Sequence, residues 1–246
     1  MQRLRIATVH TDEPEIFYSL QGEGISLGRP SVFVRLSGCN LACHWCDTPY
    51  TWFFDGHVGP HRGGQHYDRR SNSVTLDIAT VASRIQAYDC RHIVFTGGEP
   101  LLQQPALAAL CDLLDADHHV EIESNGTVAL TAAFDAHVDQ LNLSPKLRHS
   151  GNADAVRLNE AALRGHARDP RAWFKFVVAD AADADEVAAL IDRLAIPAQR
   201  VILMAEGTDS DTLLARRRWL APLCLARGWR YTDRLHIHLY GDTRGT

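Results

Sequence analysis

The chain of 246 residues is long enough for one large domain or a modest αβ barrel, and 46% hydrophobic residues can fill a sizeable core. The net charge of -5 argues against a general nucleic-acid surface. No apolar run reaches membrane-spanning length, and MQRLRIATVH lacks the apolar stretch of a secretory leader. We therefore expect a cytoplasmic protein without membrane or nucleic-acid partners, in which clustered cysteines are metal ligands and not disulfides.

Taken in chain order, the predicted elements alternate between strands and helices. Residues 31–37 (SVFVRLS) predict a strand that ends at Gly38, and residues 52–74 predict an irregular insertion rich in Gly, His, Arg and Asp. A helix is predicted at about 75–88, with one apolar face made by Ile78, Val81, Ala82 and Ile85. The remaining elements are strands at 92–96, 120–124, 140–143, 173–178, 200–204 and near 230–239, and helices at about 103–115, 183–194 and 209–227.

This alternation indicates a parallel sheet with right-handed crossovers. Polar and glycine-rich segments (GGEP, NGT, SPK, AEG) follow successive strands, at the carboxyl ends where barrels and open sheets place their active sites. Residues 148–172 show no convincing helix, so a closed eightfold barrel is not expected. We predict a single α/β domain over residues 1–246, a partial TIM-like barrel of parallel strands with fewer helices than strands.

Three cysteines fall within eight residues, in the run CNLACHWC. Cys39, Cys43 and Cys46 can hold three irons of a four-iron cluster and leave the fourth iron open to a small molecule. A structural zinc site usually needs a fourth ligand from a second cysteine or histidine pair, and none appears at the expected spacing. An electron carrier would need a fourth cysteine nearby. The other cysteines stand singly and are expected to be small buried hydrophobes: Cys90, Cys111 and Cys224.

The cysteine spacing, with Trp45 before the last cysteine, resembles the signature of the radical S-adenosylmethionine superfamily. Residues 96–100 (TGGEP) resemble that superfamily's second motif, in which glycines let backbone carbonyls approach an ammonium group. The resemblance implies that methionyl amino and carboxylate groups chelate the open iron. Electron transfer then cleaves the sulfonium and gives a 5′-deoxyadenosyl radical that abstracts a substrate hydrogen.

A narrower resemblance covers nearly the whole chain. The segments YSLQGEG and RLSGCNLACHWCDTPY, then ESNGT, SPK, KFV and HIHLYGDTRGT, resemble the 7-carboxy-7-deazaguanine synthase family of the queuosine pathway. This implies a magnesium-dependent ring contraction of 6-carboxy-5,6,7,8-tetrahydropterin to 7-carboxy-7-deazaguanine and ammonia, in which S-adenosylmethionine is reused. The chain departs from the family in the serine of ESNGT and in the histidine-rich 52–74 loop.

The resemblance also sorts the candidate site residues. The cysteines would ligate the [4Fe-4S] cluster, and the Thr48 hydroxyl would bind Mg²⁺, a cation that prefers oxygen donors; Asp47 is a rival magnesium ligand. S-adenosylmethionine would be bound by Trp45, Asp47, Gly98, Glu123, Ser144, Lys146, Met204, Ala205, Glu206 and Gly207. The substrate would be bound by Leu20, Gln21, Gly22, Glu23, Arg35, Thr96, His236 and the terminal carboxylate of Thr246.

Several of these residues have an ordinary structural interpretation as well. Gln21 and Glu23 can pair with a guanine-like edge that offers N–H donors beside a carbonyl, whereas the run QGEG by itself is typical of a turn. Arg35 can form a charge-assisted bond to the substrate carboxylate or a structural ion pair. His238 would share the face of His236 if the last strand is regular, whereas the histidines of residues 57–66 are expected to be surface residues.

The resemblance implies an electron donor such as flavodoxin and a homodimer. Two other functions remain open. One is an activase that makes a glycyl radical in a partner protein; such enzymes share the cluster and GGEP motifs but lack the LQGEG segment. The other is a non-enzymatic metal-binding module, which would contain zinc and no iron.

Overall fold

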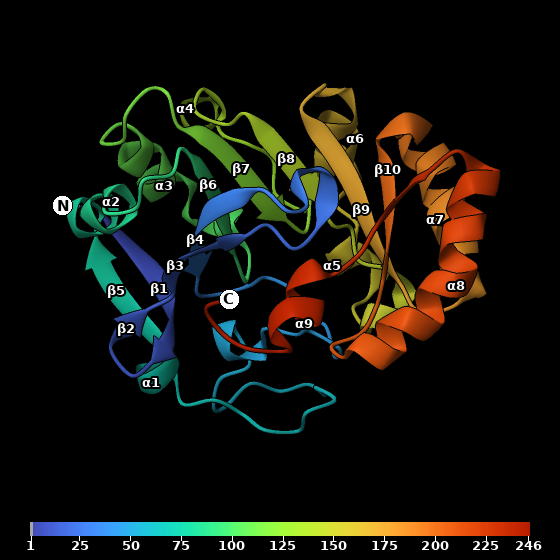
Figure 1. Ribbon diagram of the computed structural model, residues 1–246, viewed down its shortest axis with the longest axis horizontal. Helices are drawn as coiled ribbons and strands as arrows, with labels where there is room; N and C mark the ends of the chain where they lie inside the picture. The colour runs from blue at the N-terminus through green and yellow to red at the C-terminus, as the bar shows by residue number, and fades with distance from the viewer. Residues whose placement is uncertain (1) are drawn as a thin grey trace.

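The structure is a computed structural model that describes residues 2–246. In these residues one open sheet has the strand order β11-β10-β9-β8-β7-β6-β4-β1-β2, with β3 paired to β4 and β5 paired to β1 (Figure 1). The strands are β1 (Arg3–His10), β2 (Glu13–Pro14), β3 (Ile16–Leu20), β4 (Pro30–Leu36), β5 (Ser73–Asp77), β6 (His92–Gly97), β7 (His119–Ser124), β8 (Gln140–Leu143), β9 (Ala172–Val178), β10 (Val201–Ala205) and β11 (Arg230–Thr232). The α-helices are α1 (Arg69–Asn72), α2 (Ile78–Gln86), α3 (Gln104–Cys111), α4 (Ala132–Asp135), α5 (Asp154–Arg157), α6 (Glu160–Arg168), α7 (Ala181–Leu194), α8 (Ser210–Arg227) and α9 (Leu235–Tyr240).

The strands from β4 through β6 to β11 are parallel, and β1, β2, β3 and β5 add antiparallel pairs at one side. The sheet curves but does not close, because the two ends of its strand order, β11 and β2, are not paired. Among the described residues the strands outnumber the α-helices. The predicted partial barrel of parallel strands is confirmed.

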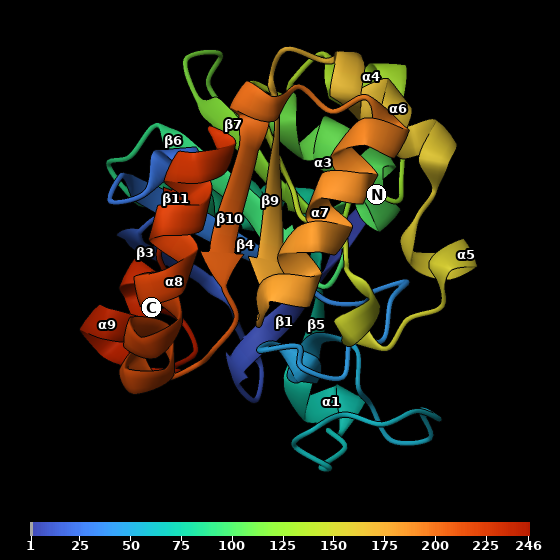
Figure 2. The same ribbon diagram turned by 90° about the vertical axis from the view of Figure 1, so that its right-hand side faces the viewer.

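Helices such as α7 and α8 cover the convex face of this sheet. The helix α7 begins with a capping box, in which Asp180 and Asp183 satisfy each other's free backbone N–H groups. Its apolar side is buried through residues such as Val187 and Ile191. Figure 2 shows α7 and α8 beside β9 and β10, the strands that they contact. The main hydrophobic core therefore lies between the sheet and the helices.

Side chains of the parallel strands alternate between the two faces of the sheet. In β7, Val120 and Ile122 belong to the main core, whereas Glu121 and Glu123 project to the opposite, concave face. Neighbouring strands follow the same rule, since Asn142 of β8 hydrogen-bonds to both glutamates. The concave face is therefore polar at β7 and β8, whereas Phe33 of β4 and Val94 of β6 belong to a small apolar cluster.

Two predictions about the second half of the chain are wrong. Residues 148–172 do contain a helix, α6, whose N-cap Asn159 accepts a hydrogen bond from the Ala162 amide. The predicted strand near 230–239 stops at Thr232 and is followed by α9. The alternating letters HIHL resemble a strand, but His236 and His238 lie on a short helix, and His238 bonds outside the cavity.

The first half also differs at element boundaries. Residues 73–77 form β5, so the helix predicted from about residue 75 starts at Ile78, after the N-cap Asp77. Its predicted apolar face is confirmed for Val81, Ala82 and Ile85, which are buried. The helix predicted to reach residue 115 ends at Cys111, and Leu113 is exposed.

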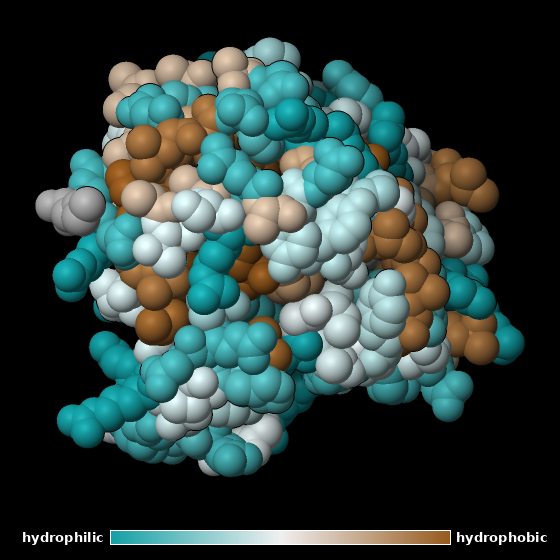
Figure 3. Space-filling model, turned by 60° about the vertical axis from the view of Figure 1, so that its left-hand side comes forward, coloured by the Kyte–Doolittle hydropathy of each residue, from teal (hydrophilic) through white to brown (hydrophobic). Residues whose placement is uncertain are grey.

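No helix formed by residues 2–246 combines the length and hydrophobicity needed to cross a bilayer. On the face drawn in Figure 3, hydrophobic side chains form small patches among hydrophilic ones. Large hydrophobic residues that are exposed lie in several separate elements, for example Tyr18, Val156 and Leu225.

Candidate active site

A cavity of about 550 Å³ lies at the carboxyl ends of the parallel strands. The cysteine loop after β4, the GGEP turn after β6 and the ends of β7, β8 and β10 all contribute to its walls. The structure brings every candidate site residue to this cavity: Leu20, Gln21, Gly22, Glu23, Arg35, Cys39, Cys43, Trp45, Cys46, Asp47, Thr48, Thr96, Gly98, Glu123, Ser144, Lys146, Met204, Ala205, Glu206, Gly207, His236 and Thr246.

The three cysteines of the loop are free thiols at one side of the cavity. Asn152 Nδ2 donates to Cys43 Sγ at 3.3 Å, and the Leu41 amide donates to Cys39 Sγ at 3.4 Å. These contacts orient two sulfur atoms before any metal arrives. Burial raises the pKa of the Cys39 thiol to about 12 and that of Cys43 to about 11, and it also raises the pKa of Cys46. Cations are therefore needed to stabilise three thiolates here.

The three cysteine sulfur atoms of the loop do not all lie within 4.8 Å of one another. Within residues 2–246, the only three Asp, Glu, His or Cys ligand atoms that all lie within 4.8 Å of one another belong to a separate acidic group. Tetrahedral zinc, with Zn–S bonds of about 2.3 Å, would hold its sulfurs about 3.8 Å apart. The wider cysteine set fits ligands to separate irons of a cluster.

The GGEP turn lies directly against the cysteine loop. A Cβ at Gly98 would meet the Gly38 carbonyl oxygen at 2.2 Å, so any larger residue would push the two segments apart. The carboxylate of Glu99 is fully buried and accepts from the Asn125 amide and the Ser124 hydroxyl, both at 2.8 Å. Glu99 thus joins the GGEP turn to the ESNGT segment after β7.

The aromatic wall beside the thiols is formed by Trp45. Its ring stacks on His149 with a centroid distance of 5.2 Å, and the Lys146 ammonium lies 5.5 Å from the ring centroid. Lys146 also donates to the Ser144 hydroxyl at 2.9 Å. The buried Nε1 of Trp45 has no hydrogen-bond partner in the described part of the chain, so a polar donor is free next to the cavity.

Elsewhere in the cavity wall, two buried cations hold three carboxylates. Lys175 Nζ lies 2.6 Å from Glu23 and 2.8 Å from Glu123. Arg234 donates to Glu23 at 3.0 Å and also pairs with Asp47. Neither cation is among the site residues predicted from the sequence. The KFV segment contained a signal, because a lysine at an inner position of a buried strand needs a charged partner.

These contacts set the charges of the wall. Burial opposes ionisation of Glu23, but Lys175 and Arg234 outweigh it and lower its pKa well below the usual value. Glu123 differs, because burial and the neighbouring Glu121 and Glu23 raise its pKa to about 7 despite Lys175. Glu23 is consequently an acceptor, whereas the pKa of Glu123 is raised toward neutral pH.

Arg35 and Thr48 flank the same space. Arg35 Nε lies 2.7 Å from Glu15, which also accepts from the Tyr50 hydroxyl at 3.1 Å, so the structural ion pair is present. Arg35 nevertheless lines the cavity. Within residues 2–246, its two terminal guanidinium nitrogens form no hydrogen bond to the protein. The Thr48 hydroxyl lies 3.6 Å from Cys46 Sγ and does not cap the following turn.

The 52–74 segment contributes more than the sequence indicated. The prediction that its histidines are surface residues is wrong for His61, which lines the cavity and whose Nε2 lies 2.8 Å from the Cys46 carbonyl oxygen. Arg62 crosses to Glu206 at 2.6 Å and thereby ties the loop to the end of β10. Of the single cysteines, Cys111 and Cys224 are buried as predicted, but Cys90 is only half-buried.

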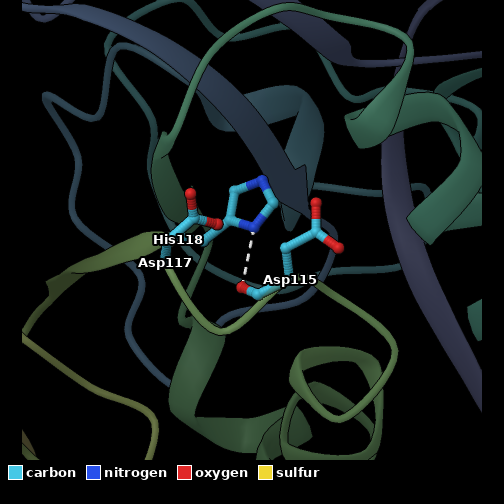
Figure 4. Close-up of side chains that lie close together, drawn as sticks. All are labelled: Asp115, Asp117 and His118. Carbon is cyan, nitrogen blue, oxygen red and sulfur yellow. Dashed lines mark hydrogen bonds between the residues drawn. The ribbon is translucent and has the colours of Figure 1, made fainter.

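A group of possible metal ligands lies outside the cavity, in the loop before β7 (Figure 4). Asp115, Asp117 and His118 converge there, and His118 Nδ1 bonds to the Asp115 carbonyl oxygen at 2.9 Å. Both aspartates are exposed, and Arg91 already pairs with them. Exposed acidic groups of this kind are common, and we assign no site to it.

Known proteins with similar sequences and folds identify the family. Residues 33–150 match the family model described as the radical SAM superfamily. The chain is 36% identical to 7-carboxy-7-deazaguanine synthase of Halobacterium salinarum, over 94% of this chain and 91% of the relative. It is 39% identical to the same enzyme of Pyrobaculum aerophilum, over 94% of this chain and 95% of the relative.

Among solved structures, the crystal structure of QueE from Escherichia coli matches with a TM-score of 0.65 and 26% identity, over 95% of each chain. The three thiols, the close GGEP turn and the unpartnered Trp45 donor fit a [4Fe-4S] cluster with S-adenosylmethionine, the cofactors of the superfamily. The chain belongs to the 7-carboxy-7-deazaguanine synthase family of radical S-adenosylmethionine enzymes.

Proposed function

We propose that this enzyme converts 6-carboxy-5,6,7,8-tetrahydropterin to 7-carboxy-7-deazaguanine and ammonia in a magnesium-dependent reaction that reuses S-adenosylmethionine. The observation that carries the proposal is one cavity that is lined by both the three thiols and the ionised Glu23. Bound S-adenosylmethionine and the reduced cluster would supply a 5′-deoxyadenosyl radical. The residues of the chain bind and orient the ligands and exclude water around them.

The distribution of charge supports this substrate class. Glu23 is held ionised and offers acceptors to the N–H groups of a pyrimidinone edge. Arg35 offers free guanidinium nitrogens to a substrate carboxylate, while Glu15 holds it in place. His236 lies against Gly22 so closely that a Cβ on Gly22 would be 2.0 Å from Nδ1. Glycine at position 22 therefore allows His236 to pack directly against this part of the cavity wall.

Magnesium is proposed at Thr48. Its hydroxyl faces the cavity without a capping role, and oxygen donors are what Mg²⁺ prefers. Asp47 is the weaker candidate, because Arg234 already occupies its carboxylate. Substrate oxygens and waters would complete the coordination shell. The reaction also needs a one-electron donor such as a flavodoxin, and we extend the family's homodimer to this chain as part of the proposal.

The proposal is tested with cluster-loaded protein under anaerobic conditions. Incubation with a reductant, S-adenosylmethionine, Mg²⁺ and 6-carboxytetrahydropterin should release ammonia and a deazapurine in equal amounts, many per molecule of S-adenosylmethionine. No deazapurine from protein with a full complement of iron would refute the reaction. The variant Thr48→Ala should retain iron but lose its response to Mg²⁺, and an unchanged response would refute the magnesium site.

A further inference from the structure

A second polar layer lies below the cavity, on the concave face of the sheet. Inner positions of parallel barrels are usually filled by branched apolar side chains. Here the structure has His92, Glu121 and Gln140 on adjacent strands, with Asn142 next to them. All four are buried, and none lines the cavity. Burying polar groups at this depth lowers stability unless their hydrogen bonds are satisfied, so we expect the layer to have a role in the fold or the site.

Glu121 is the centre of this layer. It is 0% exposed, and His92 Nε2 lies 2.8 Å from its Oε2. Its other oxygen accepts from Gln21 Nε2 at 2.5 Å and from Asn142 Nδ2 at 2.7 Å. Burial opposes ionisation, but His92, Ser26 and Gln21 lower the pKa of Glu121. An ionised carboxylate only accepts, so the atoms that face it must be donors.

This requirement fixes the side chain of Gln21. Its Nε2 points down to Glu121 and, more weakly, to Glu123 at 3.4 Å. Its Oε1 is then turned the other way, and it accepts one long hydrogen bond of 3.3 Å from the Glu23 amide. A carbonyl oxygen can accept two hydrogen bonds, so Oε1 retains capacity toward the cavity that Gln21 lines.

The backbone of Gln21 cannot change this orientation by moving. Its N–H donates to the Arg29 carbonyl at 2.8 Å, and its carbonyl accepts from the Gly28 amide at 2.7 Å. With the main chain held at both groups, the orientation of Gln21 depends on its side-chain rotations, including the flip of its amide. Glu121 removes that freedom, because the flipped amide would place two acceptors together.

We propose that Glu121, held by His92, is a positioning residue that fixes Gln21 as a hydrogen-bond acceptor, so that Gln21 and Glu23 select a ring edge presenting N–H donors. This inference rests on the proposed function and deepens it. The selected edge is a 2-amino-4-oxopyrimidine. An analogue with a carbonyl in place of the 2-amino group would place an acceptor next to the acceptors of Gln21 and Glu23. Its binding is therefore disfavoured.

The test compares two stable, fluorescent ring systems that differ only in this edge, pterin-6-carboxylate and lumazine-6-carboxylate. Their dissociation constants are measured anaerobically on cluster-loaded protein with S-adenosylmethionine bound. The wild type should prefer the pterin by about ten-fold or more, the size of one or two hydrogen bonds. Glu121→Gln can donate to Gln21 and permits the flipped amide, so the preference should fall to about three-fold or less.

Two further variants keep the outcome decisive. His92→Gln loosens Glu121 without removing it and should give a smaller loss of preference, which covers the case in which Glu121→Gln does not fold. His166→Gln is the matched control, because His166 is also buried but bonds to the Val128 carbonyl away from the cavity. A purely structural role for Glu121 would lower the melting temperature and leave the preference unchanged.

Equal wild-type affinity for both rings, or full preference in the folded Glu121 and His92 variants, would overturn the inference. Deazapurine formation is scored separately on the same samples. Wild-type protein that keeps the edge preference but forms no deazapurine would refute the proposed reaction and leave the role of Glu121 standing. Deazapurine formation without any edge preference would refute the role of Glu121 and leave the proposed reaction standing.

Discussion

The two faces of the central sheet are built from the same strands but do different work. On the convex face, Val120 and Ile122 of β7 are buried against helices in the main core. On the concave face of the same strand, Glu121 and Glu123 lie in a network of hydrogen bonds and ion pairs. The convex face stabilises the fold by hydrophobic burial. The concave face buries charged groups, which lowers stability. Substitutions on the two faces should therefore fail in different ways.

The largest effect is expected at the thiol edge of the concave face. Cys43→Ala removes one of the three protein ligands and should abolish cluster binding and activity. Iron content and the electron paramagnetic resonance spectrum of the reduced protein measure it. Cys111→Ala, on the convex side, should keep full iron and full activity. Equal iron loss in both variants would break the distinction between the faces.

Next comes the buried cation between two carboxylates. Lys175→Met leaves Glu23 and Glu123 without their shared partner, so kcat/KM should fall by about 30- to 1,000-fold. Arg171 is a useful control, because it also joins two aspartates but lies away from the cavity. Arg171→Met should change the free energy of unfolding and not kcat/KM. A normal kcat/KM in Lys175→Met would contradict the assigned wall.

A cavity in the convex core should affect stability alone. Ile122 is fully buried, and Ile122→Ala should lower the free energy of unfolding by about 2–5 kcal/mol. Urea denaturation measures this change. The folded fraction should retain its substrate affinity, and a large loss of affinity would show that the two faces are coupled through the strand.

The smallest effect is a pH dependence of stability at Glu123. Its pKa rises from 4.5 to about 7 on folding, so its contribution is complete below pH 4.5 and is lost as pH rises through 7. Glu123→Gln should remove this dependence, which amounts to at most about 1.4 kcal/mol per pH unit. Urea midpoints of both proteins between pH 5 and pH 7.5 test it. Parallel curves would mean that Glu123 is not the titrating group.

The two faces of the sheet also differ in how much of their structure can be predicted from the sequence. Strands from β6 to β10 were predicted because their apolar positions and the turns after them are local signals. The concave layer was not predicted, because polar letters such as Glu121 and Asn142 in short strands gain their meaning only from partners on other strands. Parallel strands usually have continuous apolar sequences. The alternation of polar and apolar residues in HVEIES therefore indicates that one face of β7 is polar.

The site residues followed from motif resemblance, and the cavity brings all of them together. Lys175 and Arg234 did not follow, because their roles depend on carboxylates far away in the chain. The antiparallel strands at the N-terminal side were missed as well. The ending HIHL was misread as a strand, because two-residue alternation over so short a segment fits either state.

The wall around Gly22 has a consequence for the order of assembly. Glu23 pairs with Arg234 at a separation of 211 residues, and the Gly22 carbonyl accepts from the Leu235 amide at 2.9 Å. Contacts between such distant segments close late in folding. On the ribosome, the LQGEG segment emerges long before its partner, whereas the three thiols emerge together within eight residues. A nascent chain can thus present sulfur to iron before Lys175 and Arg234, the partners of Glu23, have been synthesised.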